Sequence, residues 1–315
     1  MKKINVYILL FVTSLFVYSC TKDDGPTIEP LRDYSEQYTK DIDSINKFID
    51  THYMTVDTDY NVTFTEIPVG GTQESIRIQD DYPLEFRMVQ NDVHNVNYKV
   101  YYIKLREGVN ERPSAVDSVH ASYRGVLTTT GDQFDFAELP VWFKLQEVVP
   151  GWGAIFPLFK TGTYDTAPGP NPVTYDGYGA GVMFLPSGLG YFGNSSPSGI
   201  IPAYSNLVFT FKLFELQYMD HDRDGIFSKD EVPYGSDIFY NPVDYDSDGD
   251  GLANMFDIDD DGDGVLTKRE IRQSVDPVTG AITNYPFASI PDCSGDTTTP
   301  TRIRRHLDNM CKPPY

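Results

Sequence analysis

The chain has 315 residues, of which 40% are hydrophobic and 14% aromatic, and its formal net charge is −21. At about 150 residues per domain this length allows one or two cores, and the 22 Tyr and 19 Phe exclude a disordered acidic polymer. Phosphate recognition needs clustered Lys and Arg, so the negative charge argues against nucleic acid as a partner.

The first residues are typical of an export signal that ends at a cysteine. Two lysines follow Met1, and the stretch from Ile4 to Val17 is mostly apolar but short for a bilayer span. The next four residues, Val-Tyr-Ser-Cys, resemble the lipobox of bacterial lipoproteins, where cleavage leaves Cys20 at the new amino terminus. Tyr18 is bulkier than the residue usual at its position.

We therefore expect a signal peptide over residues 1–19 and a tether over residues 20–33, with palmitate or similar acyl chains on Cys20 that anchor an outer-membrane lipoprotein. An ordinary signal peptide with an incidental cysteine is the alternative. Residues 22–24, Lys-Asp-Asp, resemble a short signal for the cell surface, but a solvated tether explains them equally well. The periplasmic and cell-surface faces both stay open.

Residues 34–98 are expected to form an amino-terminal region of helix and strands. The apolar spacing of Ile42, Ile45, Phe48 and Ile49 predicts an amphipathic helix over 35–52. Residues 60–64 alternate like a strand, and two glycines at 70–71 predict a turn before the Ile-Arg-Ile of residues 76–78.

Beyond residue 98 the chain becomes rich in strand signals around a single helix. The helix is expected to start near Pro150, and strands are expected over 98–105, 119–127, 181–185 and 207–216. Strands around one helix predict an α+β domain.

An ordered set of segments then points to a known family. In chain order these segments are VHASYRG at 119–125, GDQFD at 131–135, FKLQEVVPGW at 143–152, FLPSGLGY at 184–191, GIIP at 199–202 and LVF at 207–209. The set resembles the FKBP-type peptidyl-prolyl cis-trans isomerases. The resemblance implies an FKBP-like antiparallel sheet wrapped on a short helix over residues 99–218.

By this resemblance, distant aromatic and apolar side chains form a proline-binding pocket. Trp152 corresponds to the floor, and Tyr191 to the tyrosine whose hydroxyl holds a substrate carbonyl. The backbone N–H of Ile201 corresponds to a second anchor, and Asp135 to a polar group at the rim. The walls correspond to Tyr123, Phe134, Val148, Val149 and Phe209. For any one of these residues alone, simple core packing is the alternative reading.

Such a pocket has a chemical rationale. Rotation about a peptide bond costs about 18–20 kcal/mol because resonance is lost, so an X-Pro bond isomerises over tens to hundreds of seconds unaided. The twisted amide is less polar than the planar one, and a dry aromatic pocket favours it. No nucleophile, cofactor or catalytic metal is required.

Three features depart from the family pattern and leave turnover open. Val141 stands where a pocket aromatic is common, which predicts a thinner wall. Pro157 is expected to interrupt the helix. Residues 161–178 resemble an insertion, which is either a lid or surface decoration.

Residues 219–272 are strongly acidic, with 16 acidic and 4 basic residues between Asp220 and Glu270. Residues 220–231 and 259–270 fit the EF-hand calcium loop, and residues 246–257 form a looser third loop that ends in Asp. The expected Ca²⁺ ligands of the first loop are Asp220, Asp222, Asp224, Ile226, Ser228 and Glu231. Those of the middle loop are Asp246, Asp248, Asp250 and Asp257, and those of the last are Asp259, Asp261, Asp263, Val265, Thr267 and Glu270.

The alternative for this segment is a hydrated acidic linker, and the middle loop is an even choice between binding and not binding. Pro233 lies where an exit helix of a sensor EF-hand would run, so we expect a structural rather than a signalling role for calcium. In the tail, residues 273–315, Cys293 and Cys311 are an even pair that predicts a disulfide in an exported protein.

The sequence thus predicts a peptidyl-prolyl isomerase that acts on proline-containing clients among exported proteins. Two rivals remain. One is a non-catalytic FKBP-like chaperone that holds apolar peptide. The other is a calcium-stiffened surface or motility accessory lipoprotein, because some FKBP-like lipoproteins of gliding bacteria resemble this chain in layout.

Overall fold

The computed structural model describes residues 30–165, 173–194 and 199–312. The expected signal peptide, Cys20 and most of the expected tether therefore lie outside the described residues. The chain over Asp33–Tyr315 forms one compact unit. Among the described residues, no helix combines the length and apolar character needed to cross a membrane.

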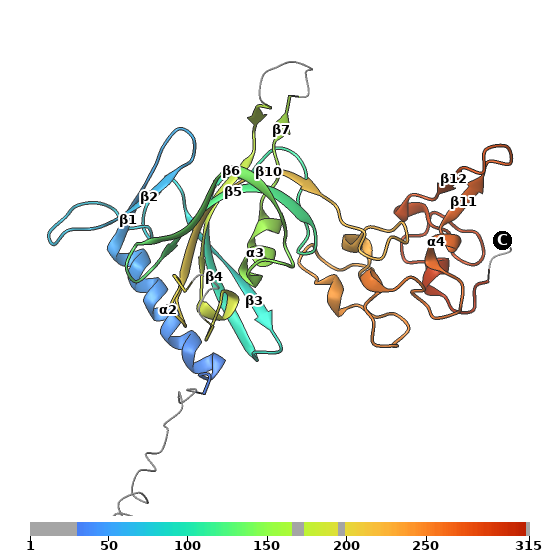
Figure 1. The fold of residues 1–315 in the computed structure, drawn as a ribbon, viewed down its shortest axis with the longest axis horizontal. Helices are drawn as coiled ribbons and strands as arrows, with labels where there is room; N and C mark the ends of the chain where they lie inside the picture. Colours follow the sequence, from blue (N-terminus) through green and yellow to red (C-terminus); the bar gives the residue numbers. More distant parts are fainter. Residues whose placement is uncertain (1–29, 166–172, 195–198, 313–315) are drawn as a thin grey trace, which may run out of the picture. The chain divides into compact units, whose positions relative to one another are not determined.

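A six-stranded sheet forms the centre of this unit (Figure 1). Each strand pairs antiparallel with its neighbour. In spatial order the strands are β3 (Leu84–Asn91), β4 (Val96–Arg106), β9 (Gly179–Leu185), β10 (Leu207–Gln217), β5 (Ser118–Leu127) and β6 (Gln133–Lys144). The mixed α/β architecture with an antiparallel sheet agrees with the expected fold class.

One face of the sheet packs against the short helix α3 (Pro150–Ile155). Side chains alternate along a strand, so on β10 Phe209 and Phe211 join the cluster that contains Trp152, whereas Val208 joins the cluster on the opposite face. The helix ends at Ile155 and continues as the 3-10 turn η1 (Phe156–Leu158). Pro157 lies in this turn, as its missing N–H and fixed φ require.

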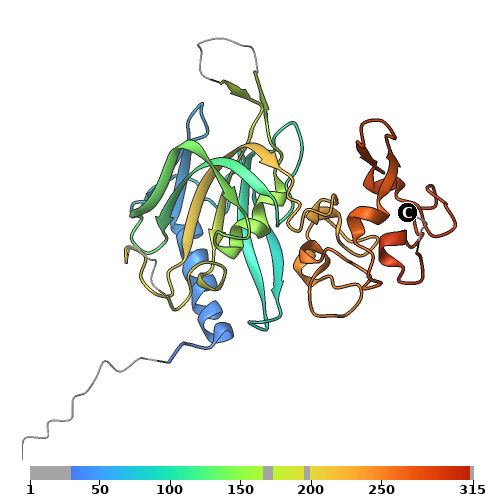
Figure 2. The same cartoon turned by 45° about the vertical axis from the view of Figure 1, so that its right-hand side comes forward.

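The other face is covered by helix α2 (Tyr34–Thr51) and by the hairpin of β1 (His52–Val56) and β2 (Val62–Glu66). The carboxylate of Asp33 caps the helix by accepting the N–H groups of Ser35 and Glu36 at 2.9 and 3.0 Å. Figure 2 shows α2 along the sheet. The helix agrees with the predicted one to within a residue at each end, but residues 76–78 form a turn.

A buried network ties α2 to the loop after β9. Asp41 is 2% exposed, and its carboxylate accepts the backbone N–H of Ser187 at 2.8 Å and the Ser187 hydroxyl at 2.6 Å. The Asn206 amide donates to the Asp41 carbonyl at 3.2 Å and accepts from the Ser187 N–H. Ser187 begins the 3-10 turn η2 (Ser187–Leu189), which precedes Tyr191. The amino-terminal helix therefore fixes the loop that carries a predicted pocket residue.

The predicted insertion begins and ends as a two-stranded hairpin, β7 (Thr163–Tyr164) with β8 (Tyr175–Asp176). Residues 166–172 lie outside the described ranges. The hydroxyl of Tyr175 donates to the Glu215 carboxylate on β10 at 2.6 Å, which attaches the base of the hairpin to the sheet.

The acidic segment and the tail are built from loops and short turns (orange to red in Figure 2). Within residues 219–312, all of which are described, no helix exceeds the four residues of α4 (Thr267–Glu270). The 3-10 turns are η3 (Ser228–Asp230), η4 (Pro242–Asp244), η5 (Asn254–Phe256), η6 (Phe287–Ser289) and η7 (Arg305–Leu307), and the strands are β11 (Arg272–Val275) and β12 (Ile282–Asn284). Paired EF-hand helices are therefore absent from this stretch.

Two features stabilise the acidic segment and the tail. Ile226, Ile271 and Ile290 form a small buried cluster. Cys293 and Cys311 are joined as a disulfide, with their Cα atoms 5.3 Å apart. The cross-link closes a loop in a region with little apolar core of its own, where such a constraint contributes most.

Candidate functional site

A cavity of about 400 Å³ lies between β5, β6, β10 and the start of α3. Eight of the nine side chains that the sequence places in a pocket line it: Tyr123, Phe134, Asp135, Val148, Val149, Trp152, Tyr191 and Phe209. They come from five separate segments, and the sheet topology brings them together. The ninth residue, Ile201, was expected to offer its backbone N–H rather than its side chain; it is 3% exposed, belongs to the same core cluster as Trp152 and is not one of the lining residues.

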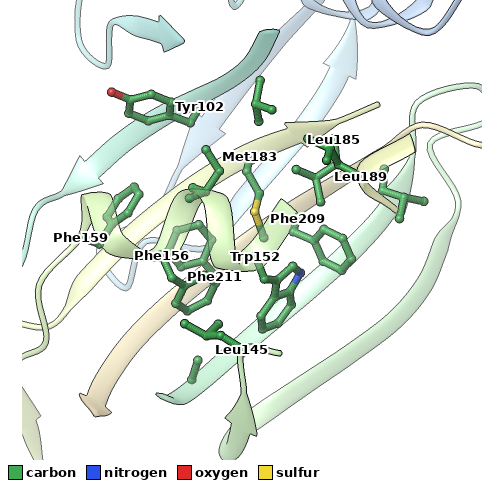
Figure 3. Packing of buried hydrophobic residues seen from close by; sticks show 14 of the residues in the cluster. Tyr102, Leu145, Trp152, Phe156, Phe159, Met183, Leu185, Leu189, Phe209 and Phe211 are labelled. Atoms are coloured by element: carbon green, nitrogen blue, oxygen red, sulfur yellow. The ribbon is translucent and has the colours of Figure 1, made fainter. Parts of the chain in front are cut away.

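Trp152 lies at the base of the cavity and is only 3% exposed. Four rings surround its indole, with centroid distances of 5.0 Å to Phe156, 5.1 Å to Tyr123, 5.3 Å to Phe143 and 5.4 Å to Phe209. The Phe156 ring is stacked on it and the other three meet it edge to face. Figure 3 shows the indole beside the Phe209 ring. Such pairs fix ring positions beyond what apolar burial alone would do.

Two glycines make this arrangement possible. A Cβ on Gly125 of β5 would overlap the ring of Phe134, so only glycine lets that ring lie across the strand. A Cβ on Gly151 would overlap the side chain of Leu185 on β9, so glycine lets α3 approach the sheet closely. Helix α3 starts with Pro150 in its first turn, which suits a position whose N–H has no helical partner.

One polar contact stands at the rim. The Tyr123 hydroxyl donates to the Asp135 carboxylate at 2.6 Å, and the other oxygen of Asp135 accepts the N–H of Phe136 at 2.9 Å. Burial raises the pKa of Tyr123, and the bond to Asp135 adds to the effect. Burial and the nearby Asp135 charge also raise the pKa of Tyr191. Both phenols therefore stay protonated and able to donate at neutral pH.

The expected thin wall at Val141 is corrected by the structure. Val141 is 41% exposed and lies outside the cavity lining. Phe143, two residues further along β6, lines the cavity and supplies an aromatic ring next to Trp152. Strand alternation places both residues on the same face of β6, so periodicity alone could not choose between them.

Sequence reasoning also missed three other lining residues: Glu147, Pro150 and Gly190. Each is a direct chain neighbour of a predicted site residue, and that adjacency was the only signal that could have found it.

The three acidic loops share one backbone geometry, and we call residues 220–231 loop 1, residues 246–257 loop 2 and residues 259–270 loop 3. In each, the first Asp accepts the N–H of the sixth residue, a glycine, at 3.2, 2.9 and 3.0 Å respectively. These glycines, Gly225, Gly251 and Gly264, have φ values of +104°, +99° and +86°. That conformation favours glycine, and it turns the loop back on its own carboxylates.

The ninth side chain of each loop has a bracing hydrogen bond. The hydroxyls of Ser228 and Thr267, two of the expected ligands, each accept a hydrogen bond from the N–H of the second loop residue, His221 at 3.2 Å and Asp260 at 3.1 Å. In loop 2 the Asn254 side chain accepts the Ser247 N–H in the same way at 2.8 Å. The ninth side chain braces the loop in all three cases.

Carboxylates from these loops gather in three groups whose oxygens lie within 4.8 Å of one another. Asp246, Asp248 and Asp250 form one group, and Asp259, Asp261 and Asp263 form another. The remaining group, which we call the first cluster, joins Asp222, Asp224 and Glu231 of loop 1 with Asp260. Asp260 was not among the expected ligands, and the only signal for it in the sequence is an extra Asp at the second position of loop 3.

The hydrogen bonding of the buried carboxylate oxygens shows whether cations fit these three groups. Among the described residues, carboxylate oxygens without a hydrogen-bond partner occur on Asp222, Asp224, Glu231, Asp259, Asp260, Asp261, Asp263 and Glu270. A buried unpartnered carboxylate is costly unless a cation or proton neutralises it. Oxygen-only donor sets of this kind suit hard divalent cations.

The crowding also shows in the proton affinity of these groups. Burial, followed by repulsion from nearby carboxylates, raises the pKa of Asp222 to about 8 and that of Glu231 to about 9. The same causes raise the pKa of Asp260 to about 10 and that of Glu270 to about 9. A cation that takes the place of the proton would therefore stabilise each of these carboxylates.

Comparisons with known proteins found a curated relative for about a third of the chain and a family model that matches part of the acidic segment and the tail. The "Probable FKBP-type 25 kDa peptidyl-prolyl cis-trans isomerase" of Pseudomonas aeruginosa is 30% identical over 109 residues, which are 33% of this chain and 48% of that relative. The chain thus spans about half the length of this curated relative. A family model described as BamM C-terminal matches residues 221–300.

Two solved structures are also similar to the chain. A peptidyl-prolyl cis-trans isomerase from Pseudomonas syringae has 24% identity and a TM-score of 0.31, with 38% of this chain and 75% of that chain covered. FkpA from Escherichia coli has 20% identity and a TM-score of 0.34, with 59% and 61% covered. The curated relative supports the FKBP-type peptidyl-prolyl isomerase family for about a third of the chain.

Proposed function

We propose that this protein is a peptidyl-prolyl cis-trans isomerase that acts on X-Pro bonds of exported polypeptides. The observation that carries the proposal is the single cavity in which Tyr123, Phe134, Trp152 and Phe209 meet from distant strands around an indole base. A volume of about 400 Å³ suits a proline ring with its flanking peptide.

In this mechanism the pocket binds the proline ring on Trp152 and excludes water from the amide. The planar amide loses hydration on entry, whereas the twisted amide, with less charge on its oxygen, loses little, so the barrier falls. Tyr191, whose phenol stays protonated, donates a hydrogen bond to a substrate carbonyl. The N–H of Ile201 serves as a second anchor for the substrate backbone, and the mechanism involves no proton transfer.

Acylation of Cys20 would hold the enzyme at the outer membrane, next to proline-containing clients that have just been exported. The rivals are a chaperone that holds apolar peptide without turnover and a surface or motility accessory of the gliding-bacteria type. Phe143 supplies an aromatic ring beside Trp152, which removes the thin wall as one of the departures that favoured the chaperone.

The test is an isomerisation assay on a proline peptide with two matched variants. Trp152→Leu removes the pocket base and should lower kcat/KM by about tenfold or more, which corresponds to about 1.4 kcal/mol of barrier. Trp142→Leu is the control, since Trp142 is 49% exposed and stacks on His120 outside the cavity. A parent chain without activity, or equal activity in both variants, would contradict the isomerase proposal.

We also propose that loops 1 and 3, and the similarly shaped loop 2, bind Ca²⁺ in a structural role. The unpartnered buried carboxylate oxygens support this, since calcium takes six to eight oxygen ligands. Calorimetric titration of the full chain should show two or three sites, and chelation should leave the isomerase rate intact while lowering the melting temperature. No heat of binding would contradict the calcium proposal without touching the isomerase.

A further inference from the structure

Asp260 stands out among the acidic residues because its side chain leaves its own loop. It is 2% exposed, and neither of its carboxylate oxygens has a hydrogen-bond partner among the described residues. These oxygens lie with those of Asp222, Asp224 and Glu231 in the first cluster rather than with Asp259, Asp261 and Asp263 of loop 3. Asp224 and Glu231 are themselves 2% and 4% exposed.

The backbone of Asp260 is held from both sides. Its N–H donates to the Thr267 hydroxyl of loop 3 at 3.1 Å, and its carbonyl accepts the Ser247 hydroxyl of loop 2. Ser247 is in turn fixed by Asn254, whose amide donates to the Ser247 oxygen at 2.9 Å. Loops 2 and 3 therefore position a carboxylate that points into loop 1.

Within the described part of the chain, ion pairs do not neutralise the carboxylates of the first cluster. No Lys or Arg among the described residues forms an ion pair with any of its four members. Four buried carboxylates without an ion-paired cationic side chain repel one another strongly unless a cation or protons neutralise them.

We propose that Asp260 is a ligand of the calcium site in loop 1, so that loops 1 and 3 bind calcium as a coupled pair. The inference rests on the calcium proposal above and assigns to that site a residue outside its own twelve-residue loop. Calcium in loop 3 orders the Thr267 brace and with it Asp260, which completes the site in loop 1. By linkage, calcium in loop 1 tightens loop 3 by the same factor.

The test counts calcium sites by calorimetric titration of the full chain and its variants. Glu231→Gln removes a ligand of loop 1, and Glu270→Gln removes one of loop 3. Asp260→Asn should abolish the same site as Glu231→Gln, with affinity lowered roughly tenfold or more because ligand charge sets calcium affinity. Asp244→Asn is the matched control, since Asp244 is exposed and lies outside the loops.

Double variants decide the assignment. Asp260→Asn combined with Glu231→Gln should lose one site, and combined with Glu270→Gln should lose two. The opposite pattern, or an Asp260→Asn variant that titrates like Asp244→Asn, would overturn the cross-loop ligand while leaving calcium binding in place. A parent chain that binds no calcium would overturn both proposals.

A second variant tests the same assignment in case Asp260→Asn does not fold. Ser247→Ala removes the hydroxyl that holds the Asp260 carbonyl and leaves every carboxylate intact. It should weaken the loop 1 site several-fold and keep the number of sites unchanged. Parent-like affinity in this variant would contradict the positioning of Asp260 by loop 2.

Discussion

At the scale of single residues, Tyr123 separates the apolar from the polar contribution to the pocket. Its ring meets Trp152 edge to face, and its hydroxyl donates to Asp135 at 2.6 Å. Tyr123→Phe keeps the ring, and water replaces the lost bond at the exposed Asp135. We expect kcat/KM to fall by less than about tenfold, because a hydrogen bond contributes about 0.5–1.5 kcal/mol net.

Tyr123→Ala, which removes the ring as well, should lose considerably more of its kcat/KM in the same assay.

The isomerisation rate of the parent chain should be flat from neutral pH to about pH 9, because the pKa values of Tyr123 and Tyr191 are raised above the ordinary value of about 10. The proline-peptide assay, repeated from neutral pH to about pH 9, measures this dependence. A rate that declines in step with a titration below pH 9 would remove the phenols from the proposed mechanism.

The pocket residues were open to prediction because each sits in a recognisable local pattern and the segments keep their order along the chain. Asp260 was not, because the twelve-residue loop pattern assigns ligands by position within one loop and gives the second position no role. Its contact with Glu231 depends on how two loops pack, which no local pattern encodes. The bracing hydrogen bonds of Ser228 and Thr267 were not predictable either, because a hydroxyl suits a ligand and a brace equally well.

At the scale of elements, helix α3 provides a matched pair of glycines. A Cβ on Gly151 would overlap Leu185, whereas a Cβ on Gly153 would have its nearest neighbour, the Ala115 carbonyl oxygen, at 3.5 Å. We expect Gly151→Ala to destabilise the fold by about 1–3 kcal/mol through overpacking and to shift Trp152. Gly153→Ala should be neutral or stabilise by about 0.4–1 kcal/mol.

Urea unfolding measured by the fluorescence of the buried indole compares the two variants. Equal stability would mean that α3 can move away from β9 without cost, against the tight approach described here. The isomerase assay adds a second readout, since only Gly151→Ala displaces the pocket base.

Helix α2 shows where element prediction succeeds and where it stops. The apolar spacing of Ile45, Phe48 and Ile49 predicts an amphipathic helix, and all three are buried against the sheet. The spacing does not reveal that Asp41, a charged residue near that stripe, is buried and bonded to Ser187. Burial of a carboxylate becomes intelligible only when its partner, 146 residues away in the chain, is known.

The strands at the edges of the sheet illustrate the same limit. The central strands β4, β5, β9 and β10 are rich in β-branched, aromatic and other apolar residues and were predicted. The edge strands β3 and β6 were not, because one flank of each is solvent-facing and Pro140 lies within β6. Proline is tolerated at a sheet edge, where its missing N–H breaks no ladder bond.

At the scale of the whole molecule, the proposed calcium sites would link the stability of the acidic segment to pH. Without calcium, the folded state raises the pKa of Glu231 from 4.5 to about 9 and that of Glu270 from 4.5 to about 9. Between the unfolded pKa of 4.5 and the folded pKa of about 9, the folded chain binds more protons than the unfolded chain. The free energy of unfolding therefore falls as pH rises through this range. This contribution is fully present below the unfolded pKa and is lost as pH passes the folded pKa.

In chelator, the melting temperature of this segment should therefore be highest near pH 5 and decline steadily toward pH 9. With saturating calcium the decline should vanish, because the ion replaces the protons and binds more tightly as carboxylates ionise. Scanning calorimetry at several pH values, with calcium or chelator, measures both curves, and their separation should widen as pH rises. A chelated protein that became more stable with rising pH would show that these carboxylates are not crowded in the folded state, and the cation sites would lose their physical basis.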